Sequence, residues 1–304
     1  MEQLFNFDLD KISNYSEKEA LDRKKNLKLF LNTGFPNKKD ENWKFTDLNS
    51  IISKNFEIIS NNQNFKLEKK IDSIKDFEHN QIILVNGSLK SSEMKFEDKG
   101  KLKIESLNTF ENFDYPLNNN LSFLNKALSL GGFNLEIQKD YKCKKPIIIY
   151  NYHTSNLDNK IINNSNKIKL NQNSELTLIE YNIGEKSKFL KNTFEKVELE
   201  KDSIFKNITI QKTKSNGYFY KNIFGSQGYN SSYQNFILTS GLKFNKIEID
   251  MNLEKEKSNC FILSGLCVGK GEHQEIKTKI NHLAPNCKSY NLCCLHSPCF
   301  KFCW

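Results

Sequence analysis

The sequence predicts a mainly β protein in which a helical opening segment precedes a long succession of short strands. From Pro146 to about Leu283 the chain alternates strand-like runs with turns rich in Asn, Ser, Lys and Gly, and no long helical pattern interrupts them. A sandwich, a barrel and a β-solenoid all satisfy this spacing. Several runs follow one another without the Asn-Gly or Asp-Gly turns of tight antiparallel hairpins, and their spacers are of similar length, which favours a parallel solenoid.

The opening segment is predicted to form a helix over residues 17–32. Ser16 followed by Glu19 is a capping box, in which each side chain satisfies a backbone N–H group at the helix start. An imperfect apolar face follows, and Gly34 with Pro36 ends the pattern.

A polar run containing two large aromatic residues follows this helix. It reads Asp40-Glu41-Asn42-Trp43-Lys44-Phe45-Thr46-Asp47-Leu48. We expect Trp43 and Phe45 to pack inward, as core residues or as anchors for a partner, because aromatic side chains bury large apolar areas. The run is therefore predicted to be a docking element without a catalytic role.

Two further strands and one helix are predicted before Pro146. The clearest strand is Gln81 to Val85, and the Asn86-Gly87 pair after it is a strong turn signal. Residues 121–130 are predicted to form a short helix, and apolar residues then alternate over 133–137 as in a strand. The strands predicted beyond Pro146 are Ile147 to Tyr150, Ile168 to Leu170, Leu176 to Tyr181, Val197 to Leu199, Ile204 to Ile210, Phe236 to Leu238, Leu242 to Leu253, Phe261 to Val268 and Ile276 to Ile280.

Composition and motif searches exclude several functions. No stretch of the 304 residues approaches the roughly 20 consecutive apolar residues of a membrane helix, so we expect no membrane association. The net charge of +9 comes from scattered lysines without a recognisable module, which argues against nucleic acid as a partner. The N-terminus has no secretory pattern, so a cytoplasmic location is expected. The sequence contains no P-loop, G-x-G-x-x-G or H-E-x-x-H motif, so we expect no ATP hydrolysis by this chain itself.

The eight cysteines are unevenly distributed, with four of them in the last twelve residues. A reducing location makes a disulfide framework unlikely to form. The spacing of the terminal four, with His296 among them, matches no zinc-ribbon or ferredoxin arrangement, so no metal site is predicted. Cys260, Cys267 and Cys287 lack a paired His and acid, and we expect them to behave as small buried hydrophobic residues. The terminal four are Cys293, Cys294, Cys299 and Cys303.

His282 is another residue with the chemistry of a ligand or a proton relay. It ends an alternating strand just before Ala284-Pro285. A histidine in this place more often packs against a turn or hydrogen-bonds to it, so a structural role is predicted.

Several segments taken together resemble the SufB/SufD family, and SufD in particular. The Gly34-Phe35-Pro36 turn and the polar run at 40–48 are similar to the family's N-terminal hallmark. The segments Leu84-Val85-Asn86-Gly87, Leu124-Asn125-x-Ala127-Leu128 with Gly131-Gly132, and Pro146-Ile147-Ile148-Ile149 follow in the family's order. Thr278-x-Ile280-x-His282-x-x-Pro285-x-x-x-Ser289 resembles the stretch where a SufD core continues toward its C-terminal half. The resemblance covers residues 16 to 292.

The resemblance implies a fold and a function. It implies a helical or mixed N-terminal domain at 1–120, a right-handed parallel β-helix core at 121–292, and an aberrant Cys-rich tail at 293–304. It also implies a non-enzymatic scaffold in SUF iron-sulfur cluster assembly. Such a scaffold pairs edge to edge with a SufB-like paralogue, and its C-terminal helical domain grips a SufC-like ATPase. A cluster is then expected only in the assembly complex, with no cofactor bound stably by this chain.

The sequence departs from the family pattern after Leu292. In the family, further rungs, a Cys-x-His motif and a helical domain follow, whereas here the Cys-rich stretch ends the sequence. We therefore expect a C-terminally truncated chain that lacks the SufC-binding region, and no catalytic, cofactor-binding or metal-binding residue can be carried over. Two alternatives stay open. A carbohydrate-active β-helix protein needs paired carboxylates in one groove, and a structural β-solenoid needs closer repeats and usually an export signal.

Overall fold

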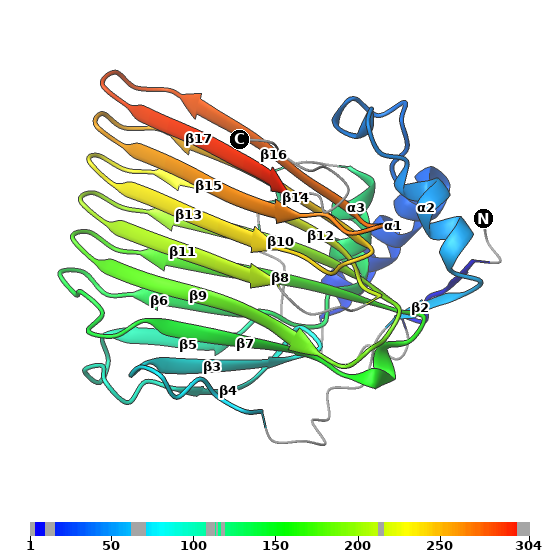
Figure 1. The fold of residues 1–304 in the computed structure, drawn as a ribbon, viewed down its shortest axis with the longest axis horizontal. Coiled ribbons are helices and arrows are strands. Elements are labelled where there is room, and N and C mark those ends of the chain that lie inside the picture. The colour runs from blue at the N-terminus through cyan, green and yellow to red at the C-terminus, as the bar shows by residue number, and fades with distance from the viewer. Residues whose placement is uncertain are drawn as a thin grey trace.

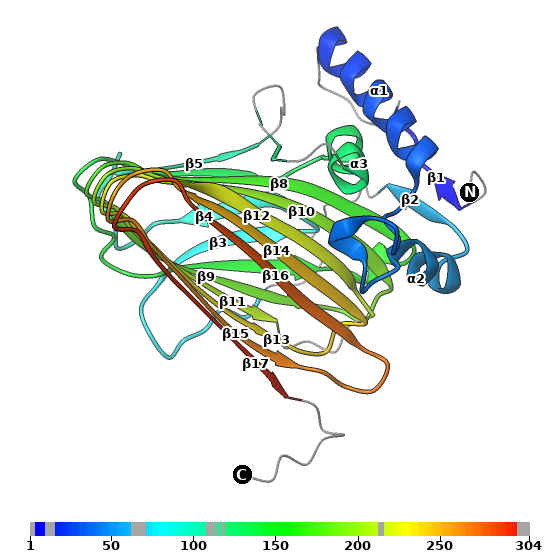
Figure 2. The ribbon, with the colours of Figure 1, turned by 90° about the horizontal axis from the view of Figure 1, so that it is seen from above.

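The computed structural model describes residues 4–9, 16–61, 71–107, 113, 115–116, 119–211 and 216–296. This part of the chain is a parallel β-solenoid that carries its helices on one side (Figure 1 and Figure 2). The predicted fold class, mainly β with a parallel β-helix core preceded by helices, is confirmed.

Helices dominate the opening part of the chain and strands dominate the rest. The helices are α1 (Glu17–Thr33), α2 (Leu48–Asn55) and α3 (Asn120–Leu128), with 3₁₀ turns at Glu41–Trp43 and Ser155–Leu157. The strands are β1 (Phe5–Asn6), β2 (Ile59–Asn61), β3 (Asn80–Val85), β4 (Ser88–Glu93), β5 (Leu102–Ser106), β6 (Phe133–Ile137), β7 (Ile147–His153), β8 (Lys160–Leu170), β9 (Glu175–Gly184), β10 (Phe189–Leu199), β11 (Ile204–Gln211), β12 (Tyr218–Gln227), β13 (Ser232–Thr239), β14 (Phe244–Leu253), β15 (Asn259–Cys267), β16 (His273–His282) and β17 (Lys288–His296).

Two sheets enclose the solenoid interior, and each turn of the chain adds one strand to each sheet. Sheet A has the order β1-β2-β8-β10-β12-β14-β16, with β6 also paired to β8 and β5 paired to β6. Sheet B has the order β17-β15-β13-β11-β9-β7-β3-β4. The pairs between successive turns are parallel. One turn takes 26 to 29 residues, because positions 170, 199, 227, 253 and 282 lie side by side.

The corner that leads from sheet A to sheet B is built alike in successive turns. Its first key residue has φ between 54° and 61° in four of these turns and is followed by serine. Asn and Asp tolerate this left-handed region better than most residues. The serine Oγ donates to the carbonyl oxygen three residues earlier, at 2.6–2.8 Å. The corner pairs are Asn173-Ser174, Asp202-Ser203, Asn230-Ser231 and Lys257-Ser258.

The opening elements form where the sequence predicts them. The Ser16 hydroxyl accepts a hydrogen bond from the Glu19 N–H at 3.1 Å and starts α1, which agrees with the predicted helix. The helix predicted at 121–130 is α3. Asn86 and Gly87, with φ of 50° and 85°, join β3 to β4 in an antiparallel hairpin. Because β3 also pairs in parallel with β7, this early strand belongs to the solenoid.

The two faces of the solenoid differ in what covers them. An apolar core that includes Phe205, Tyr233 and Met251 fills part of the interior. The helices cover the outer face of sheet A, where Phe30 and Phe194 share a second core (Figure 2). Sheet B faces the viewer in Figure 1, and no described helix lies over it. No helix in the described ranges is long and apolar enough to cross a membrane.

Candidate functional site

The polar run around Trp43 lies on the outer face of sheet A, against β12, β14 and β16. Trp43 is 3% exposed, and its ring centroid lies 5.6 Å from that of Tyr220 and 6.5 Å from that of Phe244. The Lys246 side chain is fully buried, and its Nζ lies 4.3 Å from the Trp43 ring centroid. The indole face attracts a cation, and burial strengthens this attraction.

Lys246 also ties the polar run to Glu275. Its Nζ donates to the Asn42 carbonyl oxygen at 2.8 Å and to Glu275 Oε1 at 2.6 Å. Glu275 Oε2 accepts from Thr46 Oγ1 at 2.7 Å and lies 3.4 Å from His273 Nε2. Burial alone raises the pKa of Glu275, but hydrogen bonds from His273, Lys246 and Thr46 outweigh it and lower the pKa to about 2. We call this cluster the latch, because it fastens the N-terminal helical part to the solenoid. Its members are Trp43, Thr46, Lys246, His273 and Glu275.

The prediction for Trp43 is confirmed, but the inward packing predicted for Phe45 is wrong. Phe45 is 77% exposed. The two aromatic residues are two positions apart at the end of a tight 3₁₀ turn, so their side chains leave the backbone in different directions. Trp43 and Thr46 face sheet A, while Phe45 faces solvent with the Lys44 Nζ 4.8 Å from its ring centroid.

Part of the solenoid interior is polar and holds buried charges. The Nζ of Lys221, on β12, lies 2.7 Å from Glu180 Oε2 and 3.1 Å from Glu195 Oε2. Lys191, on β10, donates to Asn182 Oδ1 at 3.4 Å. The two lysines and two glutamates have formal charges that cancel. We call Glu180, Lys191, Glu195 and Lys221 the interior charge cluster.

Burial and mutual attraction shift the pKa values of this cluster in opposite directions. Burial raises the pKa of Glu180, but Lys221 and Lys191 outweigh it and lower the pKa to about 2. Burial lowers the pKa of Lys191 to about 8 against the attraction of Glu180. Burial also lowers the pKa of Lys221, but Glu180 and Glu195 outweigh it and raise the pKa. Burial and the Lys191 charge hold the pKa of His153 well below its ordinary value, so this imidazole is neutral at pH 7.

The polar interior is too confined for a substrate. The cavity beside the cluster has a volume of about 30 Å³, which is room for a water molecule. Glu195 Oε1 and both amide atoms of Asn207 and Asn235 have no hydrogen-bond partner among the described residues. The cluster therefore lies in a closely packed polar layer between the two sheets.

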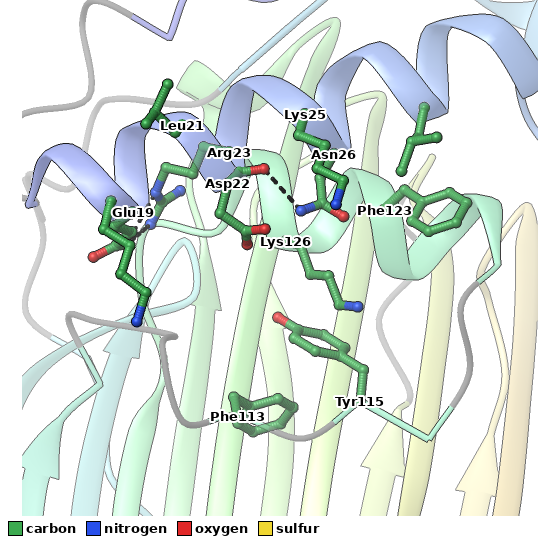
Figure 3. Close-up of a pocket in the computed structure, with 12 residues that line it drawn as sticks. Glu19, Leu21, Asp22, Arg23, Lys25, Asn26, Phe113, Tyr115, Phe123 and Lys126 are labelled. Atoms are coloured by element: carbon green, nitrogen blue, oxygen red, sulfur yellow. Dashed lines mark hydrogen bonds and ion pairs between the residues drawn. The ribbon is translucent and has the colours of Figure 1, made fainter.

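A hollow of about 740 Å³ lies between α1, α3 and the chain around Tyr115 (Figure 3). Arg23 is buried beside it, with an ion pair of 2.8 Å to Glu19 and a hydrogen bond of 3.0 Å to the Ala127 carbonyl oxygen. The Lys126 Nζ lies 5.0 Å from the Tyr115 ring centroid, and burial raises the pKa of Tyr115. The Arg23 hydrogen bond joins α1 to α3, and the Lys126 contact joins α3 to Tyr115.

Strands β16 and β17 form the open end of the solenoid. Each pairs with a strand on one side, and its other edge has no strand partner within the described ranges. The backbone N–H groups of His273 and Lys288 donate hydrogen bonds to the carbonyl oxygens of Lys243 and Ser258, on the side of the preceding turn. Successive residues of a strand direct their backbone N–H and C=O groups to alternate sides of that strand. Thr278 and Asn291 lie an odd number of positions after His273 and Lys288, so their backbone groups point to the open edge.

Two family models match consecutive parts of this chain. Residues 2–149 match the SufBD protein N-terminal region, and residues 152–293 match the SufBD core domain of SUF system FeS cluster assembly. The chain belongs to the SufB/SufD family. A role in iron-sulfur cluster assembly and partnership with other SUF proteins follow from this membership. A comparison with curated proteins gives no match.

In this SufB/SufD member the latch joins the two matched regions. Trp43 and Thr46 belong to the N-terminal region, whereas Lys246, His273 and Glu275 belong to the core. The family-like polar run at 40–48 thus positions the N-terminal helices on sheet A. This is the structural meaning of the sequence feature that we interpreted as a docking element.

The described cysteines are free thiols. Cys260 is buried, and burial raises its pKa to about 12, which makes it a poor nucleophile. Cys267 and Cys287 are only partly buried, and the Cys287 Sγ donates to the Lys255 carbonyl oxygen at 3.3 Å, close to the corner serine Ser258.

The Cys-rich tail is only partly described. Cys293 and Cys294 are exposed on β17, whereas Cys299 and Cys303 lie outside the described residues. His296 ends β17. In the ranges that the structure covers, no group of three or more His, Cys, Asp or Glu side chains is arranged to hold a metal ion.

His282 is exposed at the end of β16, and its Nε2 lies 2.9 Å from Ser289 Oγ on β17. The contact agrees with the structural role predicted for it. Sequence reasoning missed the interior charge cluster entirely. The available signal was the alternation of side chains along β9. Leu176 and Leu178 point into the interior, and Glu180 and Asn182 follow them at the same two-residue spacing.

Proposed function

We propose that this SufB/SufD member is a SufD-like, non-enzymatic scaffold subunit that pairs with a SufB-like paralogue through its open end. Membership of the SufB/SufD family and the parallel solenoid carry this proposal, and the edges of β16 and β17 that have no strand partner among the described residues offer backbone N–H and C=O groups for strand addition from another chain. SufD-like character rests on the resemblance of residues 34–48 and 278–289. The cluster is then the cargo of the complex, with ATP hydrolysis supplied by a SufC-like partner.

The absence of a catalytic role is part of the proposal. Buried lysines and carboxylates of the core pair with each other in the latch and in the interior charge cluster. Each carboxylate of the interior charge cluster has a lysine partner. The interior cavity is too small for a substrate. Both features suit a rigid frame that positions other subunits.

Proline substitutions at the open edge test this proposal. Thr278→Pro with Asn291→Pro removes one outward N–H group from each edge while leaving the ladder to β14 and β15 in place. The matched control, Thr278→Ala with Asn291→Ala, also loses the 2.7 Å hydrogen bond between these side chains but keeps both N–H groups.

Co-purification with a SufB-like paralogue is the measurement. We expect the proline variant to lose most of the paralogue and the alanine control to retain it. Retention by the proline variant, with circular dichroism showing an intact fold, would contradict pairing through the open end.

A further inference from the structure

The outer face of sheet B carries a continuous apolar surface toward the open end. We call it the apolar face and define it by Phe236, Leu238, Phe261, Leu263, Tyr290 and Leu292, which are between 36% and 51% exposed. These residues come from β13, β15 and β17, three neighbouring strands. In Figure 1 this face is turned to the viewer, with no described helix over it.

The register of sheet B aligns these side chains in rows across the strands. Phe236, Leu263 and Leu292 are direct neighbours in one row, which Ile208 on β11 extends. Phe261 and Tyr290 form a second row beside it. The only charged side chain in these two rows from β11 to β17 is Lys206, which is paired at 3.0 Å with Glu175. The centre of the face is therefore uncharged.

The size of the apolar face is in the range of a protein interface. Six large side chains exposed by about 40% present roughly 500 Å² together, taking about 200 Å² for each when free. This is near the upper limit for a monomer surface, where patches of about 300–600 Å² are already often functional. A standard interface buries about 800 Å² per partner, so the exposed apolar area supplies more than half of one side, and neighbouring polar side chains such as Lys206 and Gln234 form the rim that adds to it.

We propose that the apolar face docks on the same face of a second copy of this chain. Apolar side chains spread over three strands and two rows match the footprint of another sheet, whereas a single helix covers a narrower stripe. A hollow of about 510 Å³ lies among Ile208, Phe236, Phe261 and Tyr290, so the face has both recesses and projecting rings. Two twisted sheets pack about 10 Å apart with interdigitated side chains, and an uncharged centre carries no like-charge repulsion across a two-fold axis. This surface includes β17, but its side chains project out of the plane of sheet B, whereas the proposed function uses the in-plane backbone groups at the edges of β16 and β17.

Analytical ultracentrifugation of the full chain over a wide concentration range tests the proposal. We expect the wild-type chain to form a dimer. The dissociation constant (Kd) of this dimer should rise about 100-fold or more in the double variant Phe236→Lys with Leu263→Lys, because two central apolar side chains are replaced by charges in each copy. The matched control, Ile58→Lys with Leu21→Lys, changes the same charge at exposed apolar positions outside the face and should keep the dimer. If the lysine variant loses its circular dichroism signal, Phe236→Ser with Leu263→Ser takes its place in the same measurement.

Three outcomes would overturn the face-to-face dimer. One is a wild-type chain that stays monomeric over the whole range. Another is a dimer that survives the face variant but is lost in Thr278→Pro with Asn291→Pro, which would place self-association at the open edge. The third is a dimer that resists both variants. None of these results changes the test of the SufB-like partner, since that test uses the edge variants and a different protein.

Discussion

Replacing Lys221 by methionine removes the cation that two buried carboxylates share. Lys221 Nζ lies 2.7 Å from Glu180 and 3.1 Å from Glu195, and all three side chains are at most 12% exposed. Removing one partner of a buried ion pair leaves an uncompensated charge, so the free energy of unfolding should fall by about 3–5 kcal/mol at pH 7. Urea denaturation followed by circular dichroism measures this change.

The pH dependence gives this prediction a second test. The folded-state pKa of Glu180, about 2, lies below its ordinary value of 4.5, so its contribution is present above about pH 4.5 and is lost as the pH falls toward 2. At 1.36 kcal/mol per pKa unit this contribution is about 3 kcal/mol. In Lys221→Met the carboxylates are less well paired and protonate more easily. The destabilisation relative to wild type should therefore shrink on acidification.

Two controls separate the buried charge from a general loss of lysine. Lys206→Met removes the same group from a 3.0 Å pair with Glu175, but that lysine is 42% exposed, so a cost below about 1 kcal/mol is expected after solvent screening. Adding Glu195→Gln alone to Lys221→Met should restore much of the stability, because Glu180 and Lys191 then remain as an oppositely charged buried pair. A cost of less than about 1 kcal/mol for Lys221→Met at pH 7, or one that does not change with pH, would refute the reasoning.

Two further predictions concern the latch and the second interior lysine. Trp43→Ala should lower the free energy of unfolding by about 3–5 kcal/mol and speed proteolysis of the N-terminal helices, whereas Phe45→Ala, at an exposed position, should change it by less than about 0.5 kcal/mol. Similar effects of the two substitutions would argue against the latch. The folded-state pKa of Lys191, about 8, lies below its ordinary value of 10.5, so the unfolded chain binds more protons between these values and wild-type stability should gain up to about 3 kcal/mol as the pH rises through this window. Lys191→Met should remove this gain in urea titrations at either end of the window, and an unchanged pH slope would contradict the assignment.

The sequence was sufficient for the fold class and for most strands of sheet B, where inward and outward positions alternate. It missed β12 and β17 and most of β8 and β10, and β8, β10 and β12 are buried on both faces over most of their length, which hides the alternation. It did not reveal the repeat, since the repeated feature is a two-residue corner such as Asp202-Ser203 and the strands between corners share only their polarity pattern. Local spacing could not show that Phe45 turns outward either, because the 3₁₀ turn before it decides the direction of the side chain.

The latch and the interior charge cluster depend on contacts between distant parts of the chain. Lys246 bonds to Asn42 across 204 positions, and Lys221 meets Glu180 from the opposite sheet. The phase of β9 indicates that Glu180 points inward, but which cation it meets depends on how sheet A is placed against sheet B. No single strand carries that information.

The interior charge cluster fixes how sheet A is placed against sheet B. An apolar interior alone would determine the register of the strands less well. Moving β12 by one residue would turn Lys221 outward and bring Tyr220 or Asn222, which now lie on the outer face, into the interior. Moving it by two residues would restore the facing but separate Lys221 from Glu180 and Glu195 and leave Lys191 as the one cation of the cluster beside two buried carboxylates. The apolar half of the interior, with rows of Ile, Leu and Val, distinguishes such shifts only by packing. We therefore infer that the buried charges are kept for register. On the proposed function, in which the edges of β16 and β17 meet a partner strand, such alignment requires a fixed register in every turn.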